Sequence, residues 1–185
     1  MHNKIIQIAL IILVILFVGC RSSGNVRNNE NLPPQDPITG VVKIHSIIPF
    51  APNNTIALNI KNECKIGEQL SEFIATYTKG KNIEIQREPS VASTDAGQVL
   101  MIEITNAVSE GNAFIGHRKF TRIKGTLFRD GVEVSSFSGG RNSMGGAFAG
   151  FKGSCSVLGR TADALGGDVA RWLMNPVKNG GIGDF

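Results

Sequence analysis

Three cysteines carry the most distinctive chemistry in this sequence, because a thiol can be acylated, oxidised or used as a nucleophile. Cys20 follows a short polar start with Lys4 and an almost unbroken apolar run over residues 5–18. This order, closed by the small residue Gly19, is typical of a secretory signal peptide. The run is also shorter than the ~20 residues that a stable membrane-spanning helix needs. The alternative is one anchoring helix with an incidental cysteine, but no run of charges follows Cys20 to stop transfer.

The segment Leu16-Phe17-Val18-Gly19-Cys20 resembles the lipobox of bacterial lipoproteins, with Phe17 where that family usually has leucine. The resemblance implies removal of residues 1–19, diacylglycerol on the Cys20 thiol and acylation of the new amine, so that Cys20 should label with palmitate. The attached chains would hold the protein on a membrane, at ~0.8 kcal/mol per buried methylene. Arg21, in place of an aspartate, implies sorting to the outer membrane, facing the periplasm.

Export has consequences for cofactors and for the other two thiols. An exported domain folds in an oxidising compartment without nucleotides, so we expect no nucleotide-dependent activity and no cofactor. If Cys20 is lipidated, Cys64 and Cys155 remain as an even pair. An even pair in an oxidising compartment predicts one disulfide, Cys64–Cys155.

A glycine-rich segment over residues 138–154 invites comparison with a phosphate-binding loop. The lysine and hydroxyl of such a loop directly follow its last glycine. Here Phe151 and Gly153 interrupt that order, so nucleotide binding is not expected. The segment is either a plain flexible connection or an interaction loop, whose apolar side chains Met144, Phe148 and Phe151 would insert into a partner or a bilayer.

Other candidate residues give weaker signals. His45 and His117 lack neighbours at ligand spacing, so we expect no metal site. Glu103, Asp163 and Asp168 are expected to be ordinary solvated carboxylates, although a carboxylate pair can be set by the fold alone. The basic run 118–124, with Arg122 and Lys124 on one face, is expected to be a charged edge strand. Its alternative role is to bind an anionic envelope polymer; nucleic acid is not expected in that compartment.

The chain divides into four segments by composition. Residues 1–19 form the signal peptide, and residues 20–38 hold the lipidated cysteine and a flexible tether. The tether is rich in Asn, Ser, Gly and Pro and carries too little apolar surface to offset the entropy of ordering. Residues 39–175 are expected to form a single domain, and residues 176–185 a flexible C-terminal tail.

Hydrophobic periodicity predicts the elements of that domain. Apolar residues at helical spacing indicate helices over 65–78 and 154–174. Asp130-Gly131 between two alternating runs indicates a tight hairpin. Strands are expected over residues 41–48, 55–61, 82–86, 99–108, 119–128 and 132–138. This order predicts an α+β fold, with a mixed or mainly antiparallel sheet and two helices packed on one face.

The glycine run that starts at Phe137 (Phe-Ser-Gly-Gly-Arg-Asn-Ser-Met-Gly-Gly) and the helix segment that starts at Ala164 (Ala-Leu-Gly-Gly-Asp-Val-Ala-Arg-Trp-Leu) resemble a group of small bacterial lipoproteins. That group is known only as a domain of unknown function. The resemblance implies a periplasmic α+β domain and brings no catalytic residues. We therefore expect a non-catalytic binding or assembly module, with a protein or an envelope polymer as partner. The alternatives are a hydrolase acting on peptidoglycan or polysaccharide, and a subunit of a ring or secretion assembly.

Overall fold

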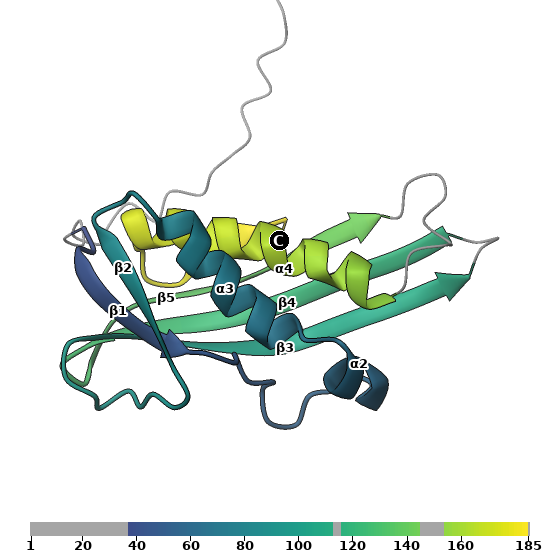
Figure 1. The fold of residues 1–185 in the computed structure, drawn as a ribbon, viewed down its shortest axis with the longest axis horizontal. Coiled ribbons are helices and arrows are strands. Elements are labelled where there is room, and N and C mark those ends of the chain that lie inside the picture. Colours follow the sequence, from purple (N-terminus) through teal and green to yellow (C-terminus); the bar gives the residue numbers. More distant parts are fainter. Residues whose placement is uncertain (1–36, 113–115, 145–153, 185) are drawn as a thin grey trace, which may run out of the picture. The chain divides into compact units, whose positions relative to one another are not determined.

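The computed structural model describes residues 37–112, 116–144 and 154–184, and Figure 1 draws their elements in chain order. They are β1 (Gly40–His45), α2 (Leu58–Glu63), α3 (Ile66–Thr78), β2 (Ile83–Glu88), β3 (Gln98–Asn112), β4 (Gly116–Arg129), β5 (Val132–Met144), α4 (Ser154–Met174) and β6 (Gly180–Gly183). The strands form one sheet in the order β2-β1-β3-β4-β5-β6. β1 runs parallel to β2 and β3, β4 is antiparallel to both of its neighbours, and β6 is parallel to β5. The fold is α+β with a mixed sheet, as predicted.

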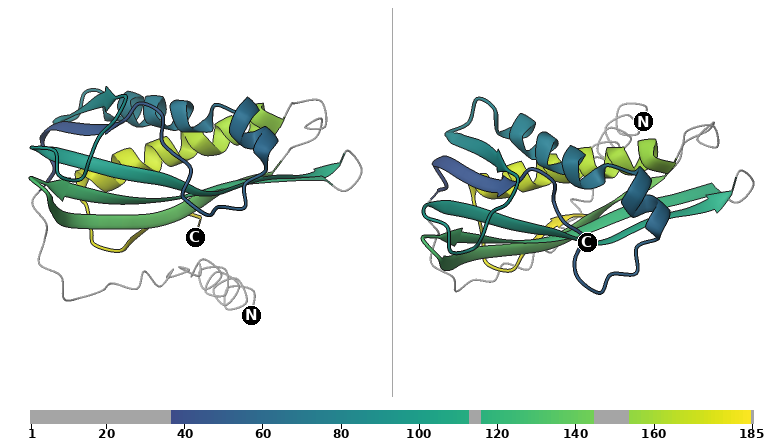
Figure 2. Two further views of the ribbon diagram at one scale, coloured as in Figure 1. Left: turned by 90° about the horizontal axis from the view of Figure 1, so that it is seen from below. Right: turned by 60° about the horizontal axis from the view of Figure 1, so that its bottom comes forward.

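Helices α3 and α4 lie side by side on one face of the sheet (Figure 2). They run in the same direction, since Gln69, Phe73 and Tyr77 along α3 lie against Gly159, Gly166 and Gly167 along α4. Between helices and sheet lies one hydrophobic core. Its fully buried large side chains are Ile44, Ile48, Ile66, Leu70, Ile74, Leu100, Ile104, Ile123, Leu127, Leu158, Leu165 and Leu173. Both predicted helices are therefore confirmed, and their apolar stripes face this core.

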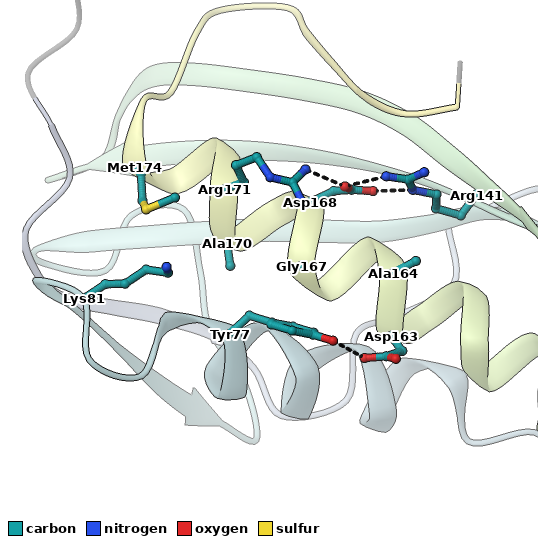
Figure 3. Close-up of a pocket in the computed structure, with 10 residues that line it drawn as sticks. All are labelled: Tyr77, Lys81, Arg141, Asp163, Ala164, Gly167, Asp168, Ala170, Arg171 and Met174. Atoms are coloured by element: carbon teal, nitrogen blue, oxygen red, sulfur yellow. Dashed lines mark hydrogen bonds and ion pairs between the residues drawn. The ribbon is translucent and has the colours of Figure 1, made fainter.

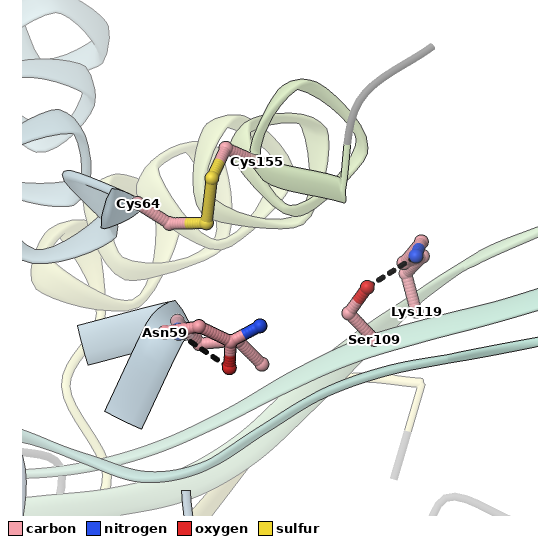
Figure 4. Close-up of a disulfide and its surroundings, with 6 residues drawn as sticks. Asn59, Cys64, Ser109, Lys119 and Cys155 are labelled. Carbon is pink, nitrogen blue, oxygen red and sulfur yellow. Dashed lines mark hydrogen bonds between the residues drawn. A yellow bond between two sulfur atoms is a disulfide. The ribbon is translucent and has the colours of Figure 1, made fainter. Parts of the chain in front are cut away.

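A disulfide joins Cys64, just before α3, to Cys155, in the first turn of α4 (Figure 4). The two Cα atoms are 4.9 Å apart, and the cysteines are separated by 91 residues. This is the pairing that the cysteine count predicted. Because the two helices are parallel, one bridge at their starts ties the N-terminal half of the domain to its C-terminal helix.

The hairpin between β4 and β5 turns at Asp130 and Gly131, as predicted, and both residues have positive φ, 50° and 83°. Asp130 also forms two hydrogen bonds with Gly97, which directly precedes β3. The Asp130 backbone N–H donates to the Gly97 carbonyl, and the Gly97 backbone N–H donates to the Asp130 carboxylate. The turn therefore fixes the start of β3 as well as the register of β4 and β5.

Three predictions about elements were wrong. Residues 55–61 are not a strand: α2 begins at Leu58, and the spacing of the buried Ile56 and Ile60 is i, i+4, which also fits a helix. β5 does not stop at 138 but continues through the glycines to Met144, because β4 pairs with it along that whole length. The predicted flexible tail contains β6, which pairs with Phe137–Gly140 of β5.

Candidate functional site

A hollow of about 450 Å³ lies on the helix side of the molecule, between the C-terminal halves of α3 and α4 (Figure 3). Two side chains from α3 and the turn after it, Tyr77 and Lys81, line one wall. Arg171 and Met174 from the last turns of α4 line the other wall, and Arg141 reaches in from β5. A second hollow of about 440 Å³ continues past Arg141 and Arg171 toward β6.

The floor between the two hollows is an ion-pair network centred on Asp168 of α4. Arg141 approaches this carboxylate with two N–H groups, Nε at 2.7 Å and Nη2 at 2.8 Å, and Arg171 Nη1 adds a third donor at 2.9 Å. The third nitrogen of the Arg141 guanidinium, Nη1, donates to Asp184 Oδ1 at 2.7 Å. Arg141 therefore joins α4 to the residue that follows β6, and it does so from the strand between them.

These contacts decide the charge states in the network. Burial alone would raise the pKa of Asp168, whose side chain is 2% exposed, but the hydrogen bonds from Arg141 and Arg171 outweigh burial and lower that pKa. The hydrogen bond to Asp168 likewise raises the pKa of Arg141. Asp168 is thus held as a carboxylate, which can accept hydrogen bonds but is poorly suited to donate a proton as a general acid.

Tyr77 and Asp163 form the other polar pair of the hollow. The Tyr77 hydroxyl donates to Asp163 Oδ1 at 2.8 Å, and this hydrogen bond raises the pKa of Tyr77. The phenol therefore stays protonated and links the outer sides of α3 and α4. Of the groups that line the hollow, Lys81, Arg171 and Met174 are exposed to solvent.

The opposite face of β4 and β5 forms a second candidate surface, since no described helix covers it (Figure 2). Along β4 the side chains alternate: Thr121 and Ile123 are buried on the helix side, whereas Arg122 and Lys124 point the other way and are exposed. We call this surface the open sheet face. It comprises Phe120, Arg122, Lys124, Thr126, Ser136 and Ser138, together with Glu103 of β3.

The open sheet face combines an aromatic ring, two cations and hydroxyl groups. The Arg122 guanidinium lies 5.8 Å from the centre of the Phe120 ring, and Lys124 Nζ lies 3.1 Å from a Glu103 oxygen. The prediction of an edge strand was wrong, because β4 lies between β3 and β5. The prediction that Arg122 and Lys124 share one face is confirmed. Lys119, by contrast, lies on the helix side and donates to Ser109; its burial lowers its pKa (Figure 4).

The remaining predicted site residues lie partly outside the described residues. Cys20, Phe148 and Phe151 are outside them, and Met144 is described only by its backbone at the end of β5. The interaction loop and the lipidation site therefore stay predictions. Within the described ranges no three metal-binding side chains come together, and none of the described helices is long and apolar enough to cross a membrane.

Sequence reasoning missed the Arg141–Asp168 network. Asp168 was expected to be solvated but is buried, and Arg141 was read only as part of a glycine-rich connection. The available signal was an acidic residue next to the apolar stripe of a predicted helix, with arginine three residues later. Its main partner is 27 residues away in the chain, on a strand that was predicted to have ended before it.

No family model and no curated protein matches the chain. The solved structures that resemble it in the path of the chain include the following three. A minor lipoprotein from Acinetobacter baumannii has a TM-score of 0.42 and 9% identity, covering 72% of this chain and 91% of that one. A PelC dodecamer from Paraburkholderia phytofirmans has a TM-score of 0.46 and 13% identity, covering 74% of this chain and 93% of that one. A hypothetical protein from Chlamydia trachomatis has a TM-score of 0.42 and 11% identity, covering 74% of this chain and 96% of that one. Likenesses this distant carry no information on function.

Proposed function

We propose that the protein is a lipid-anchored protein of the bacterial envelope that acts as a non-catalytic binding or assembly module. The order of residues up to Cys20 supports export and lipidation, and Arg21 supports the outer membrane, on its periplasmic side. The partner would be a protein or an envelope polymer that reaches the domain from the periplasm.

The composition of the open sheet face is the main observation that supports a binding function. A sheet with helices on one face normally keeps the other face polar, and scattered apolar groups there need no partner. Here, however, Phe120 lies beside Arg122 on a central strand, and Lys124 is on the same face; aromatic rings and arginines in such a position favour binding. The carboxylate at the centre of the helix-side hollow is, in contrast, already occupied by two arginines.

Site-specific cross-linking in intact cells tests this role. A photo-reactive amino acid replaces Lys124 on the open sheet face, and a control replaces Thr76, which is exposed on α3. We expect one adduct of defined mass from position 124, none from position 76, and loss of the adduct when Arg122→Glu is added. Equal labelling from both positions would contradict a binding role for this face. Release of fragments from purified peptidoglycan or polysaccharide by the purified protein would instead support the hydrolase alternative.

A further inference from the structure

The chain enters the domain at the same end at which both long helices finish. The described chain begins at Pro37, and the backbone N–H of Gly40 donates to Asn82 O, at 2.8 Å, directly after the turn that follows α3. Because α3 and α4 are parallel, the last turn of α4 also lies at this end, and Figure 3 shows Lys81 and Met174 together there. The polar chain that leads back to Cys20 is therefore attached beside the helix ends.

Cations and exposed apolar side chains meet at this end. Lys79 and Lys81 follow α3, Arg171 lies in the last turn of α4, and Lys178 follows α4. Exposed apolar side chains lie among them: Tyr77 is 44% exposed, Met174 42% and Val177 47%. We call these seven residues the tether-side patch. Four of them, Tyr77, Lys81, Arg171 and Met174, line the same hollow.

The nearby carboxylates compensate only Arg171, which pairs with Asp168. Asp163 accepts the Tyr77 hydroxyl, and Lys79, Lys81 and Lys178 form no ion pair with a described residue. Cations near the ends of both helices also complement their macrodipoles, which accounts for part of their placement. It does not account for Met174, Val177 and the Tyr77 ring, which expose apolar surface among those cations. A combination of basic and amphipathic side chains is what an anionic membrane surface attracts.

We propose that the tether-side patch docks on the anionic lipid headgroups of the membrane that holds Cys20. This inference rests on the proposed lipidation of Cys20. The chain between Cys20 and Pro37 reaches at most about 60 Å, which keeps the patch at a high effective concentration over the lipid surface. Each lysine or arginine near an anionic surface contributes about fivefold to the docking equilibrium. Tyr77 and Met174 would lie at the level of the headgroups, where an amphipathic aromatic ring is favoured.

Docking at this end would orient the rest of the domain. β3 begins at the tethered end, where Gln98 pairs with β1, and runs away from it to the hairpin with β4. Figures 1 and 2 show that this hairpin extends beyond the helices at the opposite end. The strands would therefore point away from the membrane surface, roughly along the membrane normal. The open sheet face would stay accessible to a partner from the side.

The test uses the full processed protein, reconstituted into vesicles through its own lipid. An environment-sensitive fluorophore is placed on Met174→Cys or, as matched control, on Leu58→Cys, which is an exposed apolar position in α2 away from the tethered end. In vesicles of phosphatidylcholine with phosphatidylglycerol, we expect a blue shift at position 174 and none at position 58. The shift should disappear in pure phosphatidylcholine and at high salt.

Charge reversal supplies the second measurement. Lys79→Glu with Lys81→Glu should lower the docked-to-undocked ratio by at least about 25-fold, because the loss of two cations alone accounts for about fivefold each, whereas Lys61→Glu with Lys65→Glu should leave it unchanged. Protein that does not remain with any vesicle would overturn lipidation and docking together. Protein that remains anchored, yet gives the same spectrum at position 174 in both kinds of vesicle, would overturn docking alone.

Discussion

Asp168 illustrates how a single residue can be both buried and charged. Moving a carboxylate out of water carries a penalty of several kcal/mol, which is offset only when charged donors satisfy its oxygens. Arg141 and Arg171 supply three such donors, all within 2.9 Å. Arg141 in turn holds Asp184, so one guanidinium connects the last helix with the end of the last strand.

Asp168→Asn should therefore destabilise the domain, because the amide loses the charge that two arginines hold. We expect a loss of about 2 kcal/mol in the free energy of unfolding, measured by denaturant titration at neutral pH. Asp163→Asn is the matched control on the same helix. Its partner Tyr77 is exposed, so its effect should be clearly smaller. Equal losses in the two variants would mean that the network contributes little.

The same residue should make stability depend on pH. The folded-state pKa of Asp168 is lowered, so its contribution is fully present above the unfolded value of ~3.9 and is lost as the pH falls through the folded-state pKa. We expect the free energy of unfolding of the wild type to decrease below about pH 4, and that of Asp168→Asn to decrease less steeply. Parallel pH profiles for the two proteins would argue against a lowered pKa.

At the scale of elements, the contact between α3 and α4 depends on one glycine. A Cβ atom built on Gly166 would lie 2.4 Å from Phe73 Cβ, and 3.0 Å from the backbone carbon of Phe73. At Gly167 a Cβ would meet the Tyr77 ring at 3.7 Å, which is an ordinary contact. Adjacent positions on one helix thus differ sharply in the space that they leave.

These two glycines provide a matched pair of variants. Gly166→Ala should destabilise the domain by about 2 kcal/mol, because the helices must separate. Gly167→Ala should be neutral, or stabilising by up to ~1 kcal/mol, because alanine has the higher helix propensity and its Cβ fits. Thermal unfolding of both variants tests whether only Gly166→Ala lowers the stability. Two stabilised proteins would show that the helices can shift without loss.

The disulfide gives the second prediction at this scale. It closes a loop whose cysteines are 91 residues apart, so in the chain-entropy model it contributes about 4.5 kcal/mol. Cys64→Ala with Cys155→Ala should lower the free energy of unfolding by about this amount. Adding a reductant to the wild type should lower its free energy of unfolding to the same extent. A double variant as stable as the oxidised wild type would show that unfolded-state entropy is not the main effect.

The elements predictable from sequence are those set by local patterns. Both long helices follow from apolar spacing, and the hairpin at Asp130 follows from its need for positive φ. The elements that were missed depend on distant partners. β6 has only four residues and is a strand because β5 offers it an edge, and the glycines after Ser138 are a strand because β4 continues alongside. The Arg141–Asp168 network could not be predicted, because the predicted strand stopped at residue 138 and therefore left Arg141 outside the sheet.

At the scale of the whole molecule, the N-terminal segment should decide where the domain is found. If Cys20 is acylated, then Cys20→Ser should abolish palmitate labelling and move the protein from the membrane fraction to the soluble fraction. Cys64→Ala with Cys155→Ala is the control, since it removes the other thiols and should leave both readouts unchanged. Continued labelling of Cys20→Ser would contradict the proposed attachment.

Because the Cys64–Cys155 disulfide joins the starts of the two helices, the time at which it forms reports how far folding has proceeded. Cys64 and Cys155 meet only when α4 has packed beside α3, and β2 to β5 lie between them in the chain. Contacts between residues so far apart in sequence form late, because the loop must close first. Trapping free thiols at successive times during oxidative refolding would therefore time the completion of the fold. If Cys20 is acylated as proposed, it cannot compete, and the two remaining cysteines have a single possible intramolecular pairing.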